Sequence, residues 1–280
     1  RKPGSFLLTG SANLLTLKTV SETLAGRIAL HELHPFSFAE SLRHRKPSSI
    51  LQKLFDIKHA EELSAQLEQK PLRETAVFSA RLLHGGYPDP CMAASASVRS
   101  RWFEAYRKTY VERDVTQLSA IERLPDFNRL ITLAAARTGQ ILNFSDLGRD
   151  CGLPYVTLRR YMNILEQTYQ TFPVYHYFTN ISKRLMKAPK LYWSDTGMAC
   201  HLLGIYDRDS LEKNSRFGAL LETWVASELA KVMGLSEDPM HLYGWRAQSG
   251  EEVDFLIKRG TRFIALEVKS SKTVESRAID

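Results

Sequence analysis

The sequence predicts a multidomain α/β fold, and three stretches carry that prediction. The first is "SFLLTGSANLL" (residues 5–15), a short apolar run ending in small polar residues, which is typical of a buried parallel strand. The second is a series of helical patterns followed by two strand-like runs over residues 126–193. The third is an amphipathic helix, residues 217–234, followed by two strand patterns within residues 250–270.

Composition and charge narrow the class of protein. The chain has 280 residues, enough for two or three domains, and its 44% hydrophobic content is typical of a globular protein. Lys and Arg (38) exceed Asp and Glu (31), and the net charge of +7 favours a polyanionic partner. No run of 18 apolar residues occurs, so we expect no membrane contact. Because Cys91, Cys151 and Cys200 are odd in number and form no CxxC motif, we expect a cytoplasmic location.

Residues 1–42 are the first predicted domain. Thr9, Gly10 and Ser11 stand at the C-terminal tip of the predicted strand, where open α/β sheets hold ligands. Residues 13–25 have a helical pattern, and residues 27–42 predict a strand followed by a helix that begins near Ser37. Because a buried parallel strand needs neighbours and little precedes this one, we expect the chain to be part of a longer protein.

The second predicted region, residues 43–120, is helical. A polar helical stretch ends at the turn cluster "HGGYPDP", and a long helix over residues 98–118 follows. In this helix Trp102, Tyr106 and Tyr110 recur at helical spacing, which is more typical of a core stripe than of a binding site.

Residues 121–205 are the third predicted domain. A short helix beginning at Asn143 or Ser145 is expected to end near Gly152, and the next helix begins at Pro154. This order of elements predicts a winged helix-turn-helix, with the third helix as the recognition helix. The three helical patterns and two strand-like runs are residues 126–139, 143–152, 154–168, 171–178 and 190–195.

The winged helix-turn-helix is predicted to contact nucleic acid, DNA more than RNA. Between Tyr155 and Trp193 there are six Lys or Arg residues and one acidic residue, a basic segment suited to phosphate contacts. Such units also bind proteins, so a protein partner is the alternative, and the charges would then simply be solvated. The residues predicted to contact nucleic acid are Thr157, Arg159, Arg160, Lys183 and Arg184.

Residues 206–280 are the fourth predicted domain, and they carry charge inside their best strand patterns. In "EEVDFLI" the apolar odd positions share one strand face and Asp254 lies on the other. In "RFIALEVKS" Glu267 and Lys269 project from one side, so Asp254 joins them if the strands are adjacent. The apolar face of the preceding helix is expected to pack on this sheet through Leu220, Leu221, Trp224, Val225 and Leu229.

Two carboxylates that converge on one point are poor packing but a good site for a hard cation. The sequence therefore predicts metal-assisted phosphodiester hydrolysis with Asp254, Glu267 and Lys269 as catalytic residues. The predicted Mg²⁺ ligands are Asp254, Glu267 and, from the preceding helix, Glu222. The order helix-Glu, strand-Asp, strand-Glu-x-Lys resembles the PD-(D/E)xK nuclease superfamily. The alternative is a surface ion pair between Glu267 and Lys269 on an edge strand.

The motifs in their order resemble one family along essentially the whole chain. "FLLTGSANLL", "GGYPDP", "YVERDV", "APKLYWSDTGMACHLLG", "GALLETWVASEL" and "ALEVKSS" resemble the prokaryotic predicted-ATPase family with an AAA-type core and a C-terminal DUF4143 region. The resemblance implies that residues 1–42 are a remnant of a P-loop, AAA-type α/β core and that the full-length protein binds ATP. It also implies that Ser11 lies near the terminal phosphate and that Arg27 contacts phosphate.

One departure from the family limits what this chain does alone. No "GK" dipeptide occurs, so the Walker A loop G-x-x-x-x-G-K-[ST] is absent and we expect no tight ATP binding by the chain itself. Two interpretations of the whole protein remain open. One is an ATPase coupled to a Mg²⁺-dependent nuclease-like domain. The other is a non-catalytic switch that binds nucleic acid or protein through a degenerate nuclease fold.

Overall fold

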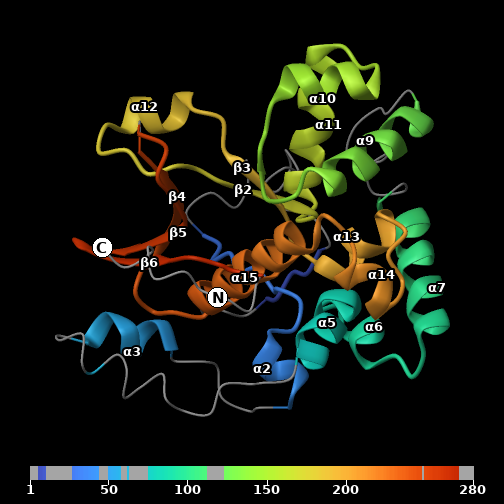
Figure 1. Ribbon diagram of the computed structural model, residues 1–280, viewed down its shortest axis with the longest axis horizontal. Coiled ribbons are helices and arrows are strands. Elements are labelled where there is room, and N and C mark those ends of the chain that lie inside the picture. Colours follow the sequence, from blue (N-terminus) through green and yellow to red (C-terminus); the bar gives the residue numbers. More distant parts are fainter. Residues whose placement is uncertain are drawn as a thin grey trace.

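The computed structural model is a mixed α/β protein with two small antiparallel sheets (Figure 1). Helices surround both sheets, and the long helix α15 (Phe217–Gly234) crosses the middle of the molecule. The structure describes residues 6–10, 27–43, 50–57, 62, 75–111, 123–247 and 249–270. No helix among these residues is long and apolar enough to cross a membrane.

The predicted N-terminal strand is wrong where the structure describes it. Residues 6–10 have no regular secondary structure and are exposed, with Leu7 89% accessible. Residues 27–34 also form no strand. The physical reason is that a strand needs a neighbour to receive its backbone hydrogen bonds, and neither sheet among the described residues includes these segments. The predicted helix over residues 13–25 lies outside the described residues.

The helix predicted near Ser37 is confirmed as α2 (Phe38–Ser41). Ser37 and Glu40 form a reciprocal capping box, in which each side chain accepts the other residue's backbone N–H. The Phe38 ring lies 5.6 Å from the ring of Trp224 on α15, and the Phe38 N–H donates to the Glu228 carboxylate at 2.8 Å. Lys231 of α15 donates to the Phe36 carbonyl at 3.0 Å. We call these contacts of residues 36–41 with α15 the α2 seat.

The helical region after α2 follows the predicted pattern with two changes. The end of the turn cluster begins a short helix, α6 (Pro88–Met92), and the long helix changes after Tyr106 into a π-helical turn. Trp102 and Tyr106 stack at 5.0 Å as part of a packed aromatic stripe, and the Tyr110 side chain lies outside the described residues. The elements are α3 (Ile50–Asp56), α5 (Thr75–His84), α6, α7 (Ala96–Tyr106) and η2 (Arg107–Val111).

Four helices and a three-stranded sheet follow in residues 124–193. The Asn143 side chain accepts the backbone N–H groups of Ser145 and Asp146, and Gly152 ends the same helix at φ 64°. The sheet has the order β1-β3-β2, and its central strand β3 is buried along its whole length. The elements are α9 (Leu124–Ala136), β1 (Gln140–Ile141), α10 (Phe144–Cys151), α11 (Tyr155–Gln167), β2 (Thr171–Val174), α12 (Ile181–Met186) and β3 (Lys190–Trp193).

The C-terminal region forms the second sheet, with the order β4-β5-β6. The two predicted strands are confirmed as β5 and β6, and the register of β4 against β5 shifts between Tyr243 and Trp245. A parallel bridge between His176 and Gly244 joins the segment after β2 to β4. The elements are α13 (Thr196–Leu202), α14 (Arg208–Glu212), α15, β4 (His241–Arg246), β5 (Glu252–Arg259) and β6 (Arg262–Leu266).

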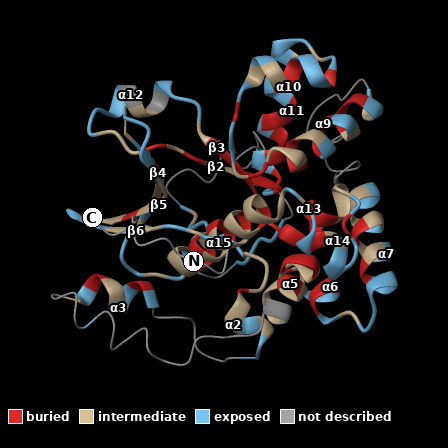
Figure 2. Ribbon diagram, viewed as in Figure 1, coloured by how far each residue is buried: buried red, intermediate tan, exposed pale blue. Residues whose placement is uncertain are grey.

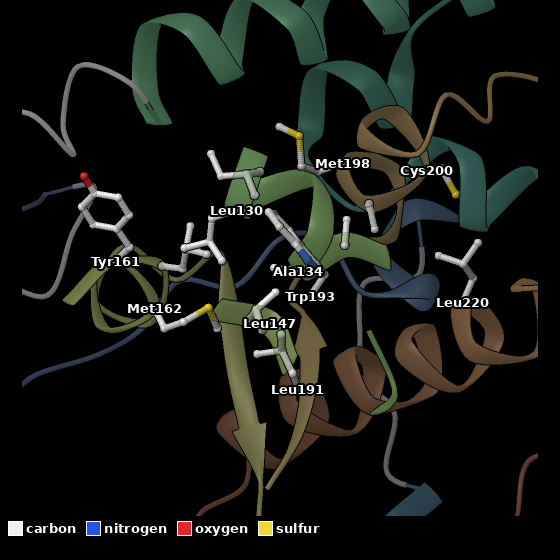
Figure 3. Close-up of a cluster of buried hydrophobic side chains, with 14 of the residues drawn as sticks. Leu130, Ala134, Leu147, Tyr161, Met162, Leu191, Trp193, Met198, Cys200 and Leu220 are labelled. Atoms are coloured by element: carbon white, nitrogen blue, oxygen red, sulfur yellow. The ribbon is translucent and has the colours of Figure 1, made fainter. Parts of the chain in front are cut away.

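Two buried apolar clusters hold these elements together, and α15 contributes to both. Figure 2 shows which parts of each element are buried. The larger cluster joins α9, α10, α11, β3 and α13, and includes Leu130, Trp193 and Leu220 (Figure 3). The second cluster packs Ala226 and Leu229 of α15 against Phe255 and Ile257 of β5. The prediction that one apolar face of α15 packs on the sheet is therefore half wrong. Its helical-core contacts are Leu220, Leu221 and Trp224, and its sheet-side contacts include Val225 and Leu229.

Candidate functional site

Strand pairing brings Asp254 and Glu267 together at one end of the C-terminal sheet. Phe255 pairs with Leu266, so the next positions outward, Asp254 and Glu267, lie opposite each other and on the same side of the sheet. The backbone N–H of Asp254 donates to Glu267 Oε2 at 3.2 Å. Asp254 Oδ2 accepts the Val268 backbone N–H at 2.9 Å, which holds the chain after β6 beside β5.

Lys269 lies beside this pair, as the sequence predicts. Its Nζ lies 2.6 Å from Glu267 Oε1, and both side chains are partly exposed. This hydrogen bond raises the pKa of Lys269. The geometry therefore combines the two alternatives drawn from the sequence: Glu267 and Lys269 form an ion pair, and that ion pair adjoins Asp254.

The structure adds a residue that the sequence analysis did not assign to the site. Lys190 begins β3, and its side chain is only 7% exposed. Its Nζ lies 2.7 Å from Glu252 Oε1, 3.1 Å from Glu222 Oε1 and 3.7 Å from Asp254 Oδ1. Three carboxylates from α15 and β5 thus surround one buried ammonium. We call these four side chains the Lys190 cluster.

Glu222 lies in this cluster because of its place on α15. Its Oε1 also accepts the Tyr192 hydroxyl at 2.5 Å. Tyr192 and Lys190 are two residues apart on β3, so both side chains project to the same side of that strand. Glu222 and Asp254 are two of the predicted metal ligands, and both contact the same ammonium group.

The pKa shifts reflect one cation shared among three carboxylates. Burial acts to lower the pKa of Lys190, but Glu252 and Glu222 outweigh burial, and the Lys190 pKa is raised. Burial raises the pKa of Glu222, and the nearby Asp254 adds to the shift. Burial likewise raises the pKa of Asp254, and Glu267 contributes in the same direction. Burial acts to raise the pKa of Glu252 as well, but Lys190 outweighs burial, and the Glu252 pKa is lowered.

A divalent cation does not fit these side chains as they lie. Glu267 is engaged by Lys269 and by the Asp254 N–H, Asp254 by Val268 and Lys190, and Glu222 by Tyr192 and Lys190. Within the described part of the chain, no group of three or more His, Cys, Asp or Glu side chains is arranged to hold a metal ion. Mg²⁺ binding would require these donors to move.

The predicted nucleic-acid residues on α11 lie at the surface. Arg159 and Arg160 are exposed, and Thr157 is half-buried. The guanidinium of Arg159 lies 5.1 Å from the centroid of the Phe144 ring and donates to the Tyr155 hydroxyl at 3.0 Å. These contacts orient Arg159 without neutralising its charge.

The predicted residues on α12 are placed differently. Arg184 donates to the Phe178 carbonyl and to the Tyr243 hydroxyl, at 2.8 and 3.0 Å, and its guanidinium lies 4.9 Å from the Tyr243 ring centroid. Arg184 therefore ties α12 to β4 of the C-terminal sheet. The side chain of Lys183 lies outside the described residues.

The two predicted nucleotide contacts remain predictions. Ser11 lies outside the described residues. Arg27 is exposed in a turn before α2.

One sequence signal points toward Lys190. A four-residue strand, "KLYW", begins with a lysine and is otherwise apolar and aromatic. A lysine inside such a strand is almost never buried without a partner, so the pattern implies an acidic partner elsewhere in the chain. Its partners lie more than 30 positions away, where local periodicity carries no information.

Comparison with known proteins gives three family matches along the chain. Residues 1–42 match an AAA domain, residues 75–209 match a domain of unknown function, DUF8612, and residues 217–280 match a second, DUF4143. The DUF8612 match crosses the predicted boundary at residue 120 between the helical region and the winged helix-turn-helix.

Two curated proteins are similar over nearly the whole chain. They are the uncharacterized proteins Mb2031c of Mycobacterium bovis and Rv2008c of Mycobacterium tuberculosis, each 30% identical over 271 residues. These alignments cover 97% of this chain and 53% of each relative, so the chain spans about half the length of the curated relatives it matches. No solved structure matches the chain. The AAA and DUF4143 matches at the two ends are consistent with an AAA-type, ATPase-like family.

Proposed function

We propose that this chain is the effector part of an AAA-type ATP-binding protein and that it binds DNA through α11. The AAA match at residues 1–42 supports the first half of the proposal, since the last residues of that range, 36–41, contact α15 in the α2 seat. ATP binding belongs to the whole protein in this proposal. This chain contributes the part that responds to the nucleotide.

The exposed start of α11 is the observation that carries the DNA-binding half. Tyr155 and Val156 are 56% and 77% exposed, and Arg159 and Arg160 are exposed one turn later. The buried side of the same helix packs Leu158 and other apolar residues into the larger core. A rigid helix therefore presents two guanidinium groups and an aromatic ring outward, as a recognition helix does.

The arrangement around α11 also supports the winged helix-turn-helix interpretation. Helices α9, α10 and α11 precede a β-hairpin, and β1 adds a third strand in the order β1-β3-β2. A helix of this kind enters the wide major groove of B-form DNA, whereas the major groove of A-form RNA is too narrow for it. Double-stranded DNA is therefore the preferred partner in our proposal.

Arginine substitutions on α11 test the proposal. The double variant Arg159→Ala with Arg160→Ala should bind duplex DNA more weakly and should reduce the slope of log affinity against log salt by about 2, since each lost phosphate contact removes about one released counterion. Arg208→Ala is the control, because Arg208 is exposed on α14 and is already paired with Glu212. Unchanged affinity and an unchanged salt slope in the double variant would contradict DNA binding through α11 and would favour a protein partner instead.

Phosphodiester hydrolysis is a second candidate function, and one observation favours it. Asp254, Glu267 and Lys269 lie together at the end of β5 and β6, in the arrangement that the PD-(D/E)xK order requires. The Lys190 cluster weighs against it, because an ammonium already engages two of the predicted metal ligands. We therefore propose a binding unit with a degenerate nuclease-like site rather than an active nuclease.

A cleavage assay separates the two candidates. The wild-type chain should leave single-stranded and duplex DNA intact in Mg²⁺ or Mn²⁺. Cleavage by the wild-type chain that disappears in Asp254→Asn and in Lys269→Met would establish the nuclease instead. Gel-shift binding by both variants provides the control, because neither residue lies on α11.

A further inference from the structure

Helix α7 carries a buried arginine whose charge is not matched. Arg99 is only 9% exposed, and among the described residues no carboxylate pairs with its guanidinium and no acceptor takes its hydrogen bonds. Burial lowers the pKa of Arg99. Burial also lowers the pKa of His84 to about 4, and the charge of Arg99 is the next cause. A buried cation ordinarily has an anion beside it, so this guanidinium lacks its usual partner.

Arg99 lines a pocket between the start of α7 and the end of α13. Helix α7 contributes Ala96, Arg99 and Ser100, and α13 with the turn after it contributes His201 and Tyr206. The rings of His201 and Tyr206 lie 5.7 Å apart. The pocket is shallow and open to solvent, so a charged group can enter it while the rest of its molecule stays outside. We call it the Arg99 pocket, and α7 lies on the opposite side of the molecule from the C-terminal sheet (Figure 1).

The start of α7 adds a second source of positive potential to the Arg99 pocket. Ala96 is the first residue of this helix of 11 residues, and it lines the pocket. The first turn contains no acidic side chain to complement the positive end of the helix dipole. Arg99, the fourth residue of the helix, adds charge of the same sign. The helix dipole and the guanidinium therefore favour an anion at the same place.

A carboxylate that contacts the pocket lining, Glu104, is already engaged by other cations. Its Oε2 lies 3.3 Å from His201 Nε2, and its Oε1 lies 2.9 Å from Arg107 Nη2 and 3.1 Å from Lys108 Nζ. The hydrogen bond from Arg107 is the main reason that the pKa of Glu104 is lowered to about 2. Glu104 is therefore ionised at pH 7, and its charge is shared among groups other than Arg99.

We propose that the Arg99 pocket binds an oxyanion, the phosphate or carboxylate group of a ligand, through the guanidinium of Arg99 and the N-terminal end of α7. A guanidinium is suited to either group, because its planar fork donates two parallel hydrogen bonds to two oxygens. The bound group supplies the negative charge that the buried arginine lacks. The inference does not depend on DNA binding by α11.

Two simple anions test the proposal and distinguish its two sources. Sodium phosphate should raise the thermal midpoint of the wild-type chain if the ligand carries a phosphate group, and sodium acetate should do so if it carries a carboxylate. Sodium chloride at the same ionic strength is the reference, because salt alone screens surface charges. In calorimetric titration with the effective anion, Arg99→Met should bind at least about tenfold more weakly than the wild-type chain, since a charge-assisted hydrogen bond is lost.

Arg101→Met is the matched control. Arg101 belongs to the same helix and is exposed, so its replacement removes the same charge without touching the pocket lining. Its anion affinity should equal that of the wild-type chain. Without added anion, Arg99→Met should be at least as stable as the wild-type chain, because the substitution removes a buried charge that has no partner. If Arg99→Met does not fold, Arg99→Gln removes the charge and keeps a polar side chain.

Three results would overturn the inference. The first is a midpoint that responds to phosphate and acetate no more than to chloride. The second is equal anion affinity in the wild-type chain and in the Arg99 variant. The third is an equal loss of affinity in the Arg99 variant and in Arg101→Met, because the anion would then respond only to the net charge of the chain.

Discussion

At the scale of single residues, the neighbouring β5 residues Asp254 and Phe255 have different structural roles. Phe255 is completely buried and packs against the Tyr192 ring at 5.8 Å, so it belongs to the core between α15 and the C-terminal sheet. Asp254 points to the other face, where it meets Val268, Glu267 and Lys190. The strand therefore has one face that stabilises the fold and one that gathers charge.

Substitutions at these two positions should have unequal effects on stability. Phe255→Ala removes a buried ring and should lower the free energy of unfolding by about 3–5 kcal/mol. Asp254→Asn should be close to neutral at pH 7, because the raised pKa of Asp254 means that the fold disfavours its ionised form, and the amide oxygen still accepts the Val268 N–H. Urea denaturation of both variants measures the difference. A loss in Asp254→Asn as large as that in Phe255→Ala would contradict the assignment of faces.

His84 should make stability depend on pH in a defined window. Burial, with Arg99 and Arg81 nearby, lowers the pKa of His84 from 6.5 to about 4 in the folded protein. The unfolded chain therefore binds the proton first as pH falls, so the contribution of neutral His84 is complete above about pH 6.5 and is lost toward pH 4. In His84→Gln, the free energy of unfolding should fall less steeply across this window. An unchanged pH profile would contradict the prediction.

At the scale of helices and strands, local signals set most of the observed ends. Asn143 caps the first turn of α10, and Gly152 at φ 64° ends the helix in a conformation that other residues rarely adopt. Replacing Asn143 by Ala should cost about 1 kcal/mol, because two backbone N–H groups lose their acceptor. Asn163→Ala, on the exposed side of α11, is the control. Thermal unfolding checks both, and equal losses would show that the cap contributes nothing specific.

The sequence predicted elements whose signal lies within a few residues. The bounds of α15 and the pairing of β5 with β6 follow from the spacing of apolar residues, and the opposition of Asp254 and Glu267 follows from that pairing. Strand β4 was missed because its alternation of apolar and polar residues breaks at Gly244, where the pairing register with β5 shifts. Strand β1 was missed because it has only two residues, and its partner strand begins 50 positions later.

The remaining features of the fold and of the candidate site could not be predicted without the tertiary structure. The side-chain position of Lys190 depends on α15 and β5, neither of which its neighbours in sequence reveal. Arg184 looked like a phosphate ligand because it lies in a basic segment, but packing against Tyr243 determines where it points. Phe6 and Leu7 have the composition of a strand, and composition supplies no partner strand. For Lys190 and Arg184 the deciding contact is long-range.

At the scale of the whole molecule, α15 makes one cooperative unit from two cores. Its Leu220 is buried in the larger cluster, whereas Ala226 and Leu229 are buried with Ile257 in the second. The Lys190 cluster and the Arg184 contact with Tyr243 add two further links between the parts of the molecule that contain these two cores. We therefore expect the two parts to unfold together.

Cavity-forming substitutions in either core should therefore leave a single cooperative unfolding transition. Leu220→Ala and Ile257→Ala should each lower the free energy of unfolding by about 2–5 kcal/mol and leave one transition. Near-ultraviolet and far-ultraviolet circular dichroism should give coincident curves for both variants. Two separated transitions in either variant would show that the cores unfold independently.

The α2 seat has a consequence for the way the chain is made. Phe38 donates to Glu228, 190 positions later in the sequence, and Lys231 reaches Phe36 across 195 positions. During synthesis on the ribosome, the α2 seat therefore cannot form until most of the chain has been made. Phe36 and Phe38 remain accessible to chaperones during that interval. Closing so large a loop is also slow in a refolding chain, because its entropy is lost before its contacts form. In pulsed hydrogen exchange during refolding, the Phe38 amide should consequently gain protection after the amides of α11.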